Sequence, residues 1–273
     1  MQIKNKKYLI IIFLLNFFLF ISNSSAEEFN ITAKEVVIDK DNEIIVGKGS
    51  VEVQDFEGKV IYTDKVTYNK SREFLLMEGN VEIADNKGNI LKTSKATYDK
   101  LNEKILTYEN SELILKDGYK LKAKNISYDV AKKILKSNEN SIFVDVEGNT
   151  IETNMFQHDI ENNLFSSIGK IKIIDINKNK YFFKEIHIDT QKKEMIGSDI
   201  SVVLDQKNFG LSNKSDPRFV ANDIFVKESK TTLSKGVFTV CQKRDDKCPP
   251  WSLKAKKIIH DQAKKIYIIN MQL

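Results

Sequence analysis

The chain contains little cysteine and little proline: its 273 residues include two cysteines and three prolines. Two cysteines are too few for a small domain held together by several disulfides, or for a four-cysteine zinc site. No proline occurs before Pro217, so the backbone up to that point can hydrogen-bond in β-ladders without interruption. With 41% hydrophobic residues the chain is too apolar to be disordered throughout, and its length allows a substantial core.

Long apolar runs are also scarce, with one exception at the N-terminus. Residues 8–21 are almost purely apolar; they follow Lys4, Lys6 and Lys7 and precede a group of small residues that ends at Ala26. This order is typical of a secretory signal peptide, so the sequence predicts a signal over residues 1–26, cleavage after Ala26 and export of the mature chain. The alternative is a retained membrane anchor, although the run is short for a spanning helix of about 20 residues.

A strong net charge is lacking as well. The formal charge of +5 comes from 43 basic and 38 acidic residues, but residues 1–26 carry three lysines and no acid. The remaining chain has 40 basic against 38 acidic residues, which leaves +2. Basic and acidic residues alternate along the chain and form no basic stripe, which argues against a nucleic-acid partner.

The body of the chain is a repeat of 30 residues, marked by three sets of positions. The first set is an aspartate or asparagine, at Asp39, Asn69, Asp99, Asp129, Asp159 and Asp189. The second is a glycine, at Gly58, Gly88, Gly118 and Gly148. The third is a glycine or glutamate, at Gly49, Gly79, Glu109, Glu139 and Gly169.

Each repeat alternates apolar and polar residues between these marks, as half-buried strands do. The aspartate is expected to begin a polar turn and to bond nearby backbone, and the glycine of the second set is expected at φ > 0. We therefore predict an all-β fold: an elongated, twisted β-jelly roll or sandwich of stacked antiparallel strand repeats with an apolar interior groove. A parallel β-helix with short rungs is the alternative architecture.

The alternation also predicts which side chains face the interior. If the groove holds a lipid, these apolar and tyrosine side chains are the candidates to contact it, although simple core packing explains them equally well. The candidates are Val36, Ile38, Val51, Val53, Val60, Tyr62, Val66, Tyr68, Val81, Ile83, Ile90, Tyr98, Leu113, Leu115, Ile126, Tyr128, Ile142 and Val144.

The repeat units, such as Ala33–Asp39 and Gly79–Ile83, resemble those of the OstA/LptA-like family of lipopolysaccharide-transport proteins. The segment from Phe238 through Cys241, Cys248 and Trp251 to Met271 is similar to the junction at the end of the N-terminal periplasmic domain of LptD proteins. The chain ends at Leu273, where the outer-membrane barrel of that family would begin. Both a fragment of a longer protein and a stand-alone module are compatible with this.

The resemblance implies a non-catalytic module at the periplasmic face of the outer membrane of a Gram-negative bacterium. It implies that lipopolysaccharide is passed with its acyl chains inside the jelly roll, toward assembly at the cell surface. The implied partners are an LptA-like bridge protein joined by edge-strand pairing, and the outer-membrane barrel with its lipoprotein plug where these are present. The expected organisation is a repeat domain over residues 27–235 and a junction segment over residues 236–273 that continues the same β fold. An LptA- or LptC-like bridge, or a β-solenoid adhesin without lipid, are the alternatives.

Other residue types give weaker indications of chemistry. The periodic aspartates have a turn explanation, and nothing marks a catalytic pair of carboxylates. His158 and His260 occupy the tyrosine position of the repeat and His187 lies in a similar strand, so packing is expected for all three rather than a metal site. Lys120, Lys122 and Lys124 alternate along one strand and are expected to share a solvated face, the alternative being contact with phosphate groups. We predict neither a cofactor nor a metal.

Cys241 and Cys248 are the only cysteines of an exported chain, which favours a disulfide. A local bridge between them would close a short polar loop. Free thiols or bonds to another chain are the alternatives, and in the resembling family disulfides between this domain and the barrel matter for assembly.

Overall fold

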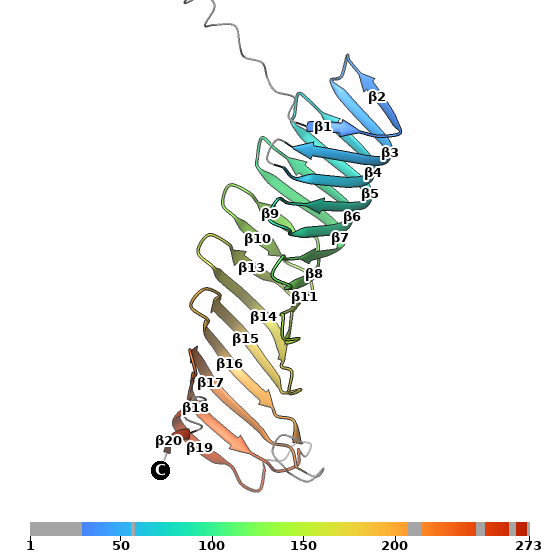
Figure 1. The fold of residues 1–273 in the computed structure, drawn as a ribbon. Coiled ribbons are helices and arrows are strands. Elements are labelled where there is room, and N and C mark those ends of the chain that lie inside the picture. Colours follow the sequence, from blue (N-terminus) through green and yellow to red (C-terminus); the bar gives the residue numbers. More distant parts are fainter. Residues whose placement is uncertain (1–28, 56–57, 207–214, 244–248, 262–265, 272–273) are drawn as a thin grey trace, which may run out of the picture.

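The computed structural model describes residues 29–55, 58–206, 215–243, 249–261 and 266–271, and these form one long twisted sheet of 20 strands (Figure 1). The predicted signal segment and its predicted cleavage site lie outside the described residues. Among those described, no helix is long and apolar enough to cross a membrane. The strands are β1 (Phe29–Thr32), β2 (Glu35–Asp39), β3 (Ile44–Asp55), β4 (Val60–Asn69), β5 (Phe74–Ala84), β6 (Ile90–Asp99), β7 (Lys104–Ile114), β8 (Lys120–Lys124), β9 (Ser127–Asp129), β10 (Ile134–Ser137), β11 (Ser141–Val144), β12 (Thr150–Thr153), β13 (Phe156–Asp159), β14 (Leu164–Ile174), β15 (Lys180–Asp189), β16 (Glu194–Val203), β17 (Arg218–Lys227), β18 (Lys230–Thr239), β19 (Leu253–Asp261) and β20 (Ile266–Met271).

Every pairing in the sheet is antiparallel, and each 30-residue repeat supplies two neighbouring layers. Some layers are one strand interrupted near its middle: β8 and β9 both pair with β7, and β1 and β2 both pair with β3. The elongated all-β prediction is confirmed, and the parallel β-helix alternative is wrong. Strand β18 runs through residue 235 and pairs with β19, so the sheet continues beyond residue 235 through Thr239 and from Leu253 to Asp261.

The two kinds of turn form as the repeat predicts. At one end of the hairpins, the Asp159 carboxylate accepts bonds from the backbone N–H and the side-chain amide of Asn162, at 2.9 and 2.8 Å. These bonds lower the pKa of Asp159. At the other end, Gly88 has φ 90° and its N–H donates to the Asp85 carbonyl. Lys178 adopts the same left-handed conformation, φ 64°, in the repeat that lacks the glycine.

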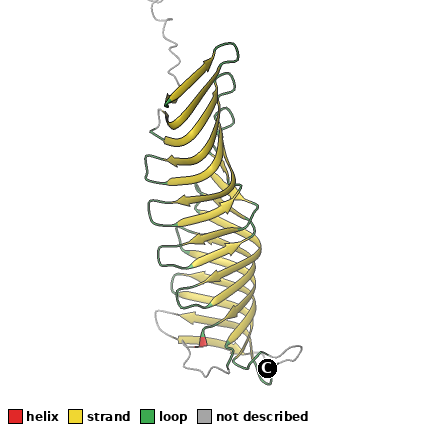
Figure 2. Ribbon diagram, turned by 90° about the vertical axis from the view of Figure 1, so that its right-hand side faces the viewer, coloured by secondary structure: helices red, strands yellow, loops and turns green. Residues whose placement is uncertain are grey.

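A β-bulge near the middle of the long strands folds the sheet lengthwise. The pairing register shifts between Lys48 and Val51, between Glu78 and Val81, and again between Ile168 and Ile171. At each shift the bulged strand has one residue more than its partner, which bends the strands. Inner-facing residues on either side of the bulge are therefore four apart on the bulged strand, as at Met77 and Val81, but three apart on the partner strand, as at Thr63 and Val66, where the alternation is reversed. The strands therefore curve, as Figure 2 shows, and the two halves of the sheet face each other across a crease.

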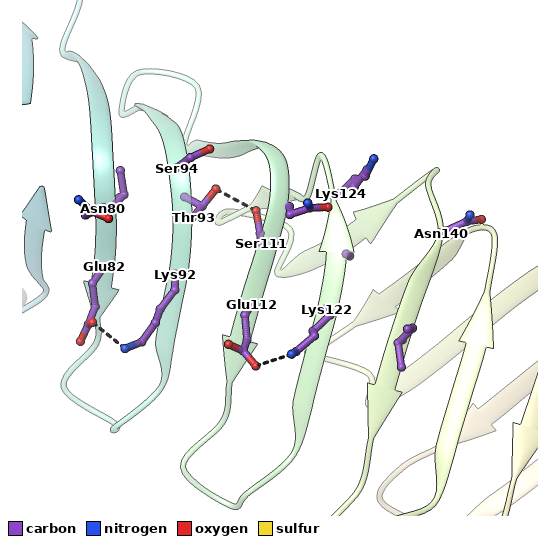
Figure 3. A pocket seen from close by; sticks show the side chains of 14 residues that line it. Asn80, Glu82, Lys92, Thr93, Ser94, Ser111, Glu112, Lys122, Lys124 and Asn140 are labelled. Carbon is purple, nitrogen blue, oxygen red and sulfur yellow. Dashed lines mark hydrogen bonds and ion pairs between the residues drawn. The ribbon is translucent and has the colours of Figure 1, made fainter. Parts of the chain in front are cut away.

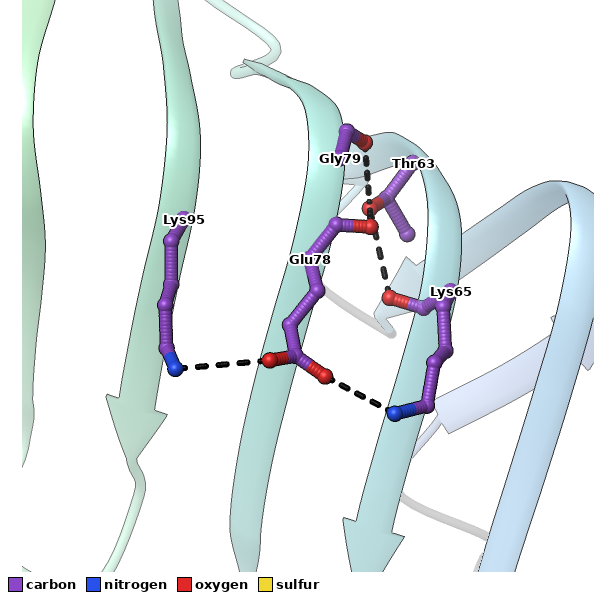
Figure 4. A network of polar contacts seen from close by, with 5 residues as sticks. All are labelled: Thr63, Lys65, Glu78, Gly79 and Lys95. Atoms are coloured by element: carbon purple, nitrogen blue, oxygen red, sulfur yellow. Dashed lines mark hydrogen bonds and ion pairs between the residues drawn. The ribbon is translucent and has the colours of Figure 1, made fainter.

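Polar contacts at the bulge of β5 stabilise this bend (Figure 4). The Thr63 hydroxyl lies 3.0 Å from the carbonyl oxygens of Glu78 and Gly79, where it supplies a donor that the disrupted ladder lacks. On the outer face, the Glu78 carboxylate joins Lys65 at 2.9 Å and Lys95 at 3.3 Å. Hydrogen bonds from these two ammonium groups lower the pKa of Glu78.

We expect Gly79→Ala to lower the free energy of unfolding by about 1–3 kcal/mol. Gly79 has φ 80°, and an added Cβ would lie 2.9 Å from the Asp64 Cβ. Urea unfolding followed by circular dichroism measures the change. The matched control is Glu109→Ala, at the equivalent position of the next repeat, where a residue with a Cβ already has φ 62°. An equal effect of the two substitutions would contradict the expectation.

The interior between the two halves packs into two hydrophobic clusters. One spans β1 to β6 and includes Val53, Leu75 and Val81; the other spans β8 to β18 and includes Phe156 and Ile186. Between them lies β7, whose buried interior residues are hydroxyl-bearing rather than apolar. The core residues are thus mainly apolar on either side of β7, whereas the buried residues of β7 itself carry hydroxyl groups.

Candidate functional site

Two apolar rows run along the inside of the folded sheet, one on each side of the crease. Directly paired residues of adjacent strands share a face, so the register defines each row. Row A contains Val53, Ile61, Ile83, Leu91, Leu113, Leu121, Phe143, Ile151, Ile173, Tyr181, Val202, Phe219 and Phe238. Row B contains Ile45, Tyr68, Leu75, Tyr98, Ile105, Tyr128, Leu135, His158, Phe165, Ile188, Met195 and Val226. Together they form a nearly unbroken apolar track.

Aromatic side chains of the two halves contact each other at two places along the track. Near the N-terminal end, the Phe29 ring meets the rings of Tyr68 and Tyr98 edge-on, at centroid distances of 5.2 and 6.2 Å. Further along, Phe143 of row A meets Phe165 of row B at 5.0 Å. These contacts cross from one half of the sheet to the other.

Between these two contacts, no pair of aromatic rings among the described residues joins the two rows, and we call the part from Leu91 to Tyr128 the open stretch. Leu91 and Leu113 of row A, and Ile105 and Tyr128 of row B, are half-buried there, as are Ile151 and Ile188 further along the rows. Burial raises the pKa of the Tyr128 hydroxyl, and nearby charges act on it in both directions.

Hydroxyl side chains line the crease beneath the rows, and they bond to each other and to the backbone. Ser111 donates to Thr107 at 2.8 Å and lies 3.0 Å from Thr93, while the Thr107 hydroxyl accepts the Ile126 N–H. Because buried polar groups cost free energy unless they are paired, these internal bonds remove the cost. The groups left to meet a ligand in the track are then mainly apolar.

Many of the predicted interior residues lie on the inner side of the sheet. They are Val36, Ile38, Val51, Val53, Val66, Tyr68, Val81, Ile83, Tyr98, Leu113, Ile126 and Tyr128. Val36 and Ile38 are nevertheless 44% and 60% exposed, because among the described strands β2 pairs with β3 alone and so lies at the edge of the sheet. Whether any of these residues binds lipid remains a prediction.

The interior assignment is wrong for the other six candidates. Val60, Tyr62, Ile90, Ile142 and Val144 lie on the outer side, and Leu115 lies beyond the end of β7 at a turn. Uninterrupted alternation along β4 and β6 places Val60, Tyr62 and Ile90 on the same side as Tyr68 or Tyr98. Opposite the bulge, however, the alternation changes phase in these two strands: Thr63 and Val66 of β4 are both buried, as are Thr93 and Ala96 of β6. In β11 the inner positions belong instead to Ser141 and Phe143.

His158 occupies the tyrosine position of row B, as the repeat predicts. Its ring lies 6.5 Å from that of Phe165, and among the described residues its buried Nε2 has no hydrogen-bond partner. Burial lowers the pKa of the imidazole, and the nearby Asp159 charge only partly opposes this shift. His158 is therefore neutral in the folded protein at neutral pH.

We expect His158→Tyr, which restores the residue of the other repeats, to stabilise the protein more at pH 5 than at pH 8. The folded-state pKa of His158 lies below the unfolded value of about 6.5. Stability is therefore lost as pH falls below about 6.5, because only the unfolded chain takes up the proton there, and tyrosine removes this loss. Urea unfolding at pH 5 and at pH 8 measures the change in the free energy of unfolding. An equal gain in stability at both pH values would contradict the expectation.

A polar relay that sequence patterns did not indicate lies on the outer face of β14 and β15. The Ser166 hydroxyl lies 2.9 Å from His187 Nδ1, and His187 Nε2 lies 2.8 Å from a Glu185 carboxylate oxygen. Activation of a nucleophilic serine also needs donors aimed at a developing oxyanion. Here β14 is paired on both sides, which commits its backbone N–H groups to the ladders. The relay orients His187 and offers no such donors from this strand.

The remaining predicted residues are structural or outside the described part. The three lysines of β8, Lys120, Lys122 and Lys124, share an exposed face, and Lys122 lies 3.5 Å from Glu112. The described residues contain no cluster of three or more potential metal ligands. Cys241 lies 3.8 Å from the Trp251 carbonyl, but Cys248 is outside the described residues, so their pairing stays a prediction.

The chain was compared with family models, with curated proteins and with solved structures. No family model matches the chain, and no curated protein matches it. A solved structure is similar over 39% of this chain and 79% of its own, with 16% identity and a TM-score of 0.35. It is that of LptH, the LptA-homologous periplasmic component of the lipopolysaccharide transport device from Pseudomonas aeruginosa.

Proposed function

We propose that the chain is a non-catalytic periplasmic module that binds the acyl chains of lipopolysaccharide along its apolar track and passes the lipid toward the outer membrane. The observation that carries the proposal is the track itself, with one apolar side chain from nearly every layer. Burying an acyl chain gains about 0.8 kcal/mol per CH₂. Because successive layers offer similar contacts, a chain can advance along the track between the two aromatic contacts without meeting one deep binding site.

The open ends of the sheet support the proposal. Strand β2 pairs on one side only and exposes the inner-facing Val36 and Ile38, and β20 at the other end exposes Ile268 and Ile269. An edge strand of this kind is a template for a strand of another protein. A similar domain docked on β2 would cover the exposed apolar residues and lengthen the track. We propose an LptA-like bridge protein as such a partner.

The finer proposal is that this is the periplasmic domain of an LptD-like protein, with the barrel and its lipoprotein plug as partners at the C-terminal end. It rests on the resemblance of the segment from Phe238 to Met271. An LptA- or LptC-like bridge would use the same track without a barrel.

The proposal is tested by incubating the purified mature chain with lipopolysaccharide and separating the complex by size exclusion. We expect lipopolysaccharide to elute with the protein, and free lauric acid in excess to reduce the amount bound. If all the lipopolysaccharide elutes separately from the folded protein, the proposal is overturned. If excess lauric acid does not reduce the amount of lipopolysaccharide bound, the lipid binds outside the apolar track.

A further inference from the structure

The sheet carries a second hollow, on the face opposite the apolar track. This outer groove has a volume of about 890 Å³ and extends over β5 to β8 and β11 (Figure 3). Its side chains alternate with interior ones: Glu112, for example, stands between the inner-facing Ser111 and Leu113. The groove is also lined by Val81, Thr93, Ser111 and Ala123, whose side chains face the interior, so it is the outward side chains of the groove that lie on the face opposite the track.

One row of the outer groove consists of paired charges. Glu82 and Lys92 lie 2.9 Å apart on neighbouring strands, and Glu112 and Lys122 lie 3.5 Å apart two strands further on. Each pair neutralises itself, so this row presents donors and acceptors with little net charge. Such a lining suits a ligand that is rich in hydroxyl groups and weakly charged.

The second row of the outer groove is rich in amides. Asn80, Asn110 and Asn140 are exposed and recur every 30 residues, that is, on every second layer of the sheet, with Ser94 and Lys124 between them. Each amide group both donates and accepts hydrogen bonds, as a sugar hydroxyl does. Two strand spacings amount to about 9.5 Å, which is close to the length of two linked pyranose rings.

An exposed aromatic ring extends the charged row at one end. Tyr62 pairs directly with Glu82 and so shares its face, and the side chain is 47% exposed. A flat ring with a polar tip beside a polar groove can stack against the apolar face of a sugar. Tyr62 thus adds stacking to the hydrogen bonds of the two rows.

We propose that the outer groove binds a linear oligosaccharide. The amides of Asn80, Asn110 and Asn140 contact successive disaccharide units, the ion pairs bond the hydroxyls between them, and Tyr62 stacks on the sugar at one end. The sugar chain lies across the strands. This site is independent of lipid binding in the track, because the two ligands occupy opposite faces of the sheet.

Isothermal titration of the full mature chain tests the proposal with two probes. One is a β-1,4-linked tetramer of N-acetylglucosamine, which represents cell-wall glycan, and the other is the saccharide of fully de-acylated lipopolysaccharide. We expect at least one probe to bind, and the probe that binds identifies the source of the sugar. Failure of both probes at millimolar concentration would overturn the proposal.

A matched pair of variants locates the binding site. We expect the double substitution Asn110→Leu with Asn140→Leu to weaken binding at least tenfold. The control is Gln157→Leu, which removes an exposed amide from β13, outside the groove, and should leave the dissociation constant unchanged. Equal affinity of the double variant and the wild-type chain, with both folded by circular dichroism, would contradict the site.

Discussion

Replacing Phe156 with alanine should lower the free energy of unfolding by about 3–5 kcal/mol. Phe156 is only 2% exposed, and its ring lies 4.7 Å from that of Phe143 and 6.1 Å from that of Phe165. These three rings hold the two halves of the sheet together where the second cluster begins. Its own strand, β13, has only four residues, so few ladder bonds compensate for the cavity.

The measurement is urea unfolding followed by far-ultraviolet circular dichroism. The control is Phe182→Ala on the outer face of β15, where the side chain is 37% exposed and the change should stay below about 1 kcal/mol. If both variants lost the same stability, the aromatic contact across the crease would not be what holds the halves together.

The second large effect concerns ligand binding. We expect Leu113→Asp to weaken the binding of lipopolysaccharide at least tenfold while the chain stays folded. Leu113 is a half-buried member of row A in the open stretch of the track, so it can accept a carboxylate without unfolding the protein. An acyl chain that covers this carboxylate would have to strip its water, which is unfavourable.

Titration of fluorescently labelled lipopolysaccharide into each variant measures this effect. The control is Ile168→Asp, which adds the same charge on the outer face, where the side chain is 53% exposed. Its dissociation constant should match that of the wild-type chain. Equal weakening by both substitutions would indicate a general effect of charge and would count against the track.

The sequence predicts much of this fold because its information is local and repeated. The aspartate at Asp159 and the glycine at Gly88 each specify a turn through their own backbone bonds and conformation, so the 30-residue period gives the hairpins directly. Valine, isoleucine and tyrosine between the turns give the strands. The alternation before the aspartate turns places Tyr68 on the inner face, where the structure also has it.

The bulges limit the prediction of the site. The shift of register between Tyr62 and Lys65 reverses the side to which Tyr62 points, and simple alternation contains no sign of it. The left-handed conformation at Gly79 and Glu109 could have provided the signal, because the third periodic set lies at the bulges. The relay of His187 with Ser166 depends on pairing between strands and has no counterpart in the linear sequence.

Photo-crosslinking in living cells tests the central claim most directly. A photoreactive phenylalanine analogue replaces Tyr128, which faces the open stretch of the track, and in a second strain it replaces Tyr62, which faces outward. The proposed function predicts capture of lipopolysaccharide at position 128 and little or none at position 62. Capture at neither position, or equal capture at both, with the two proteins folded and exported, would contradict transport along the interior of this sheet.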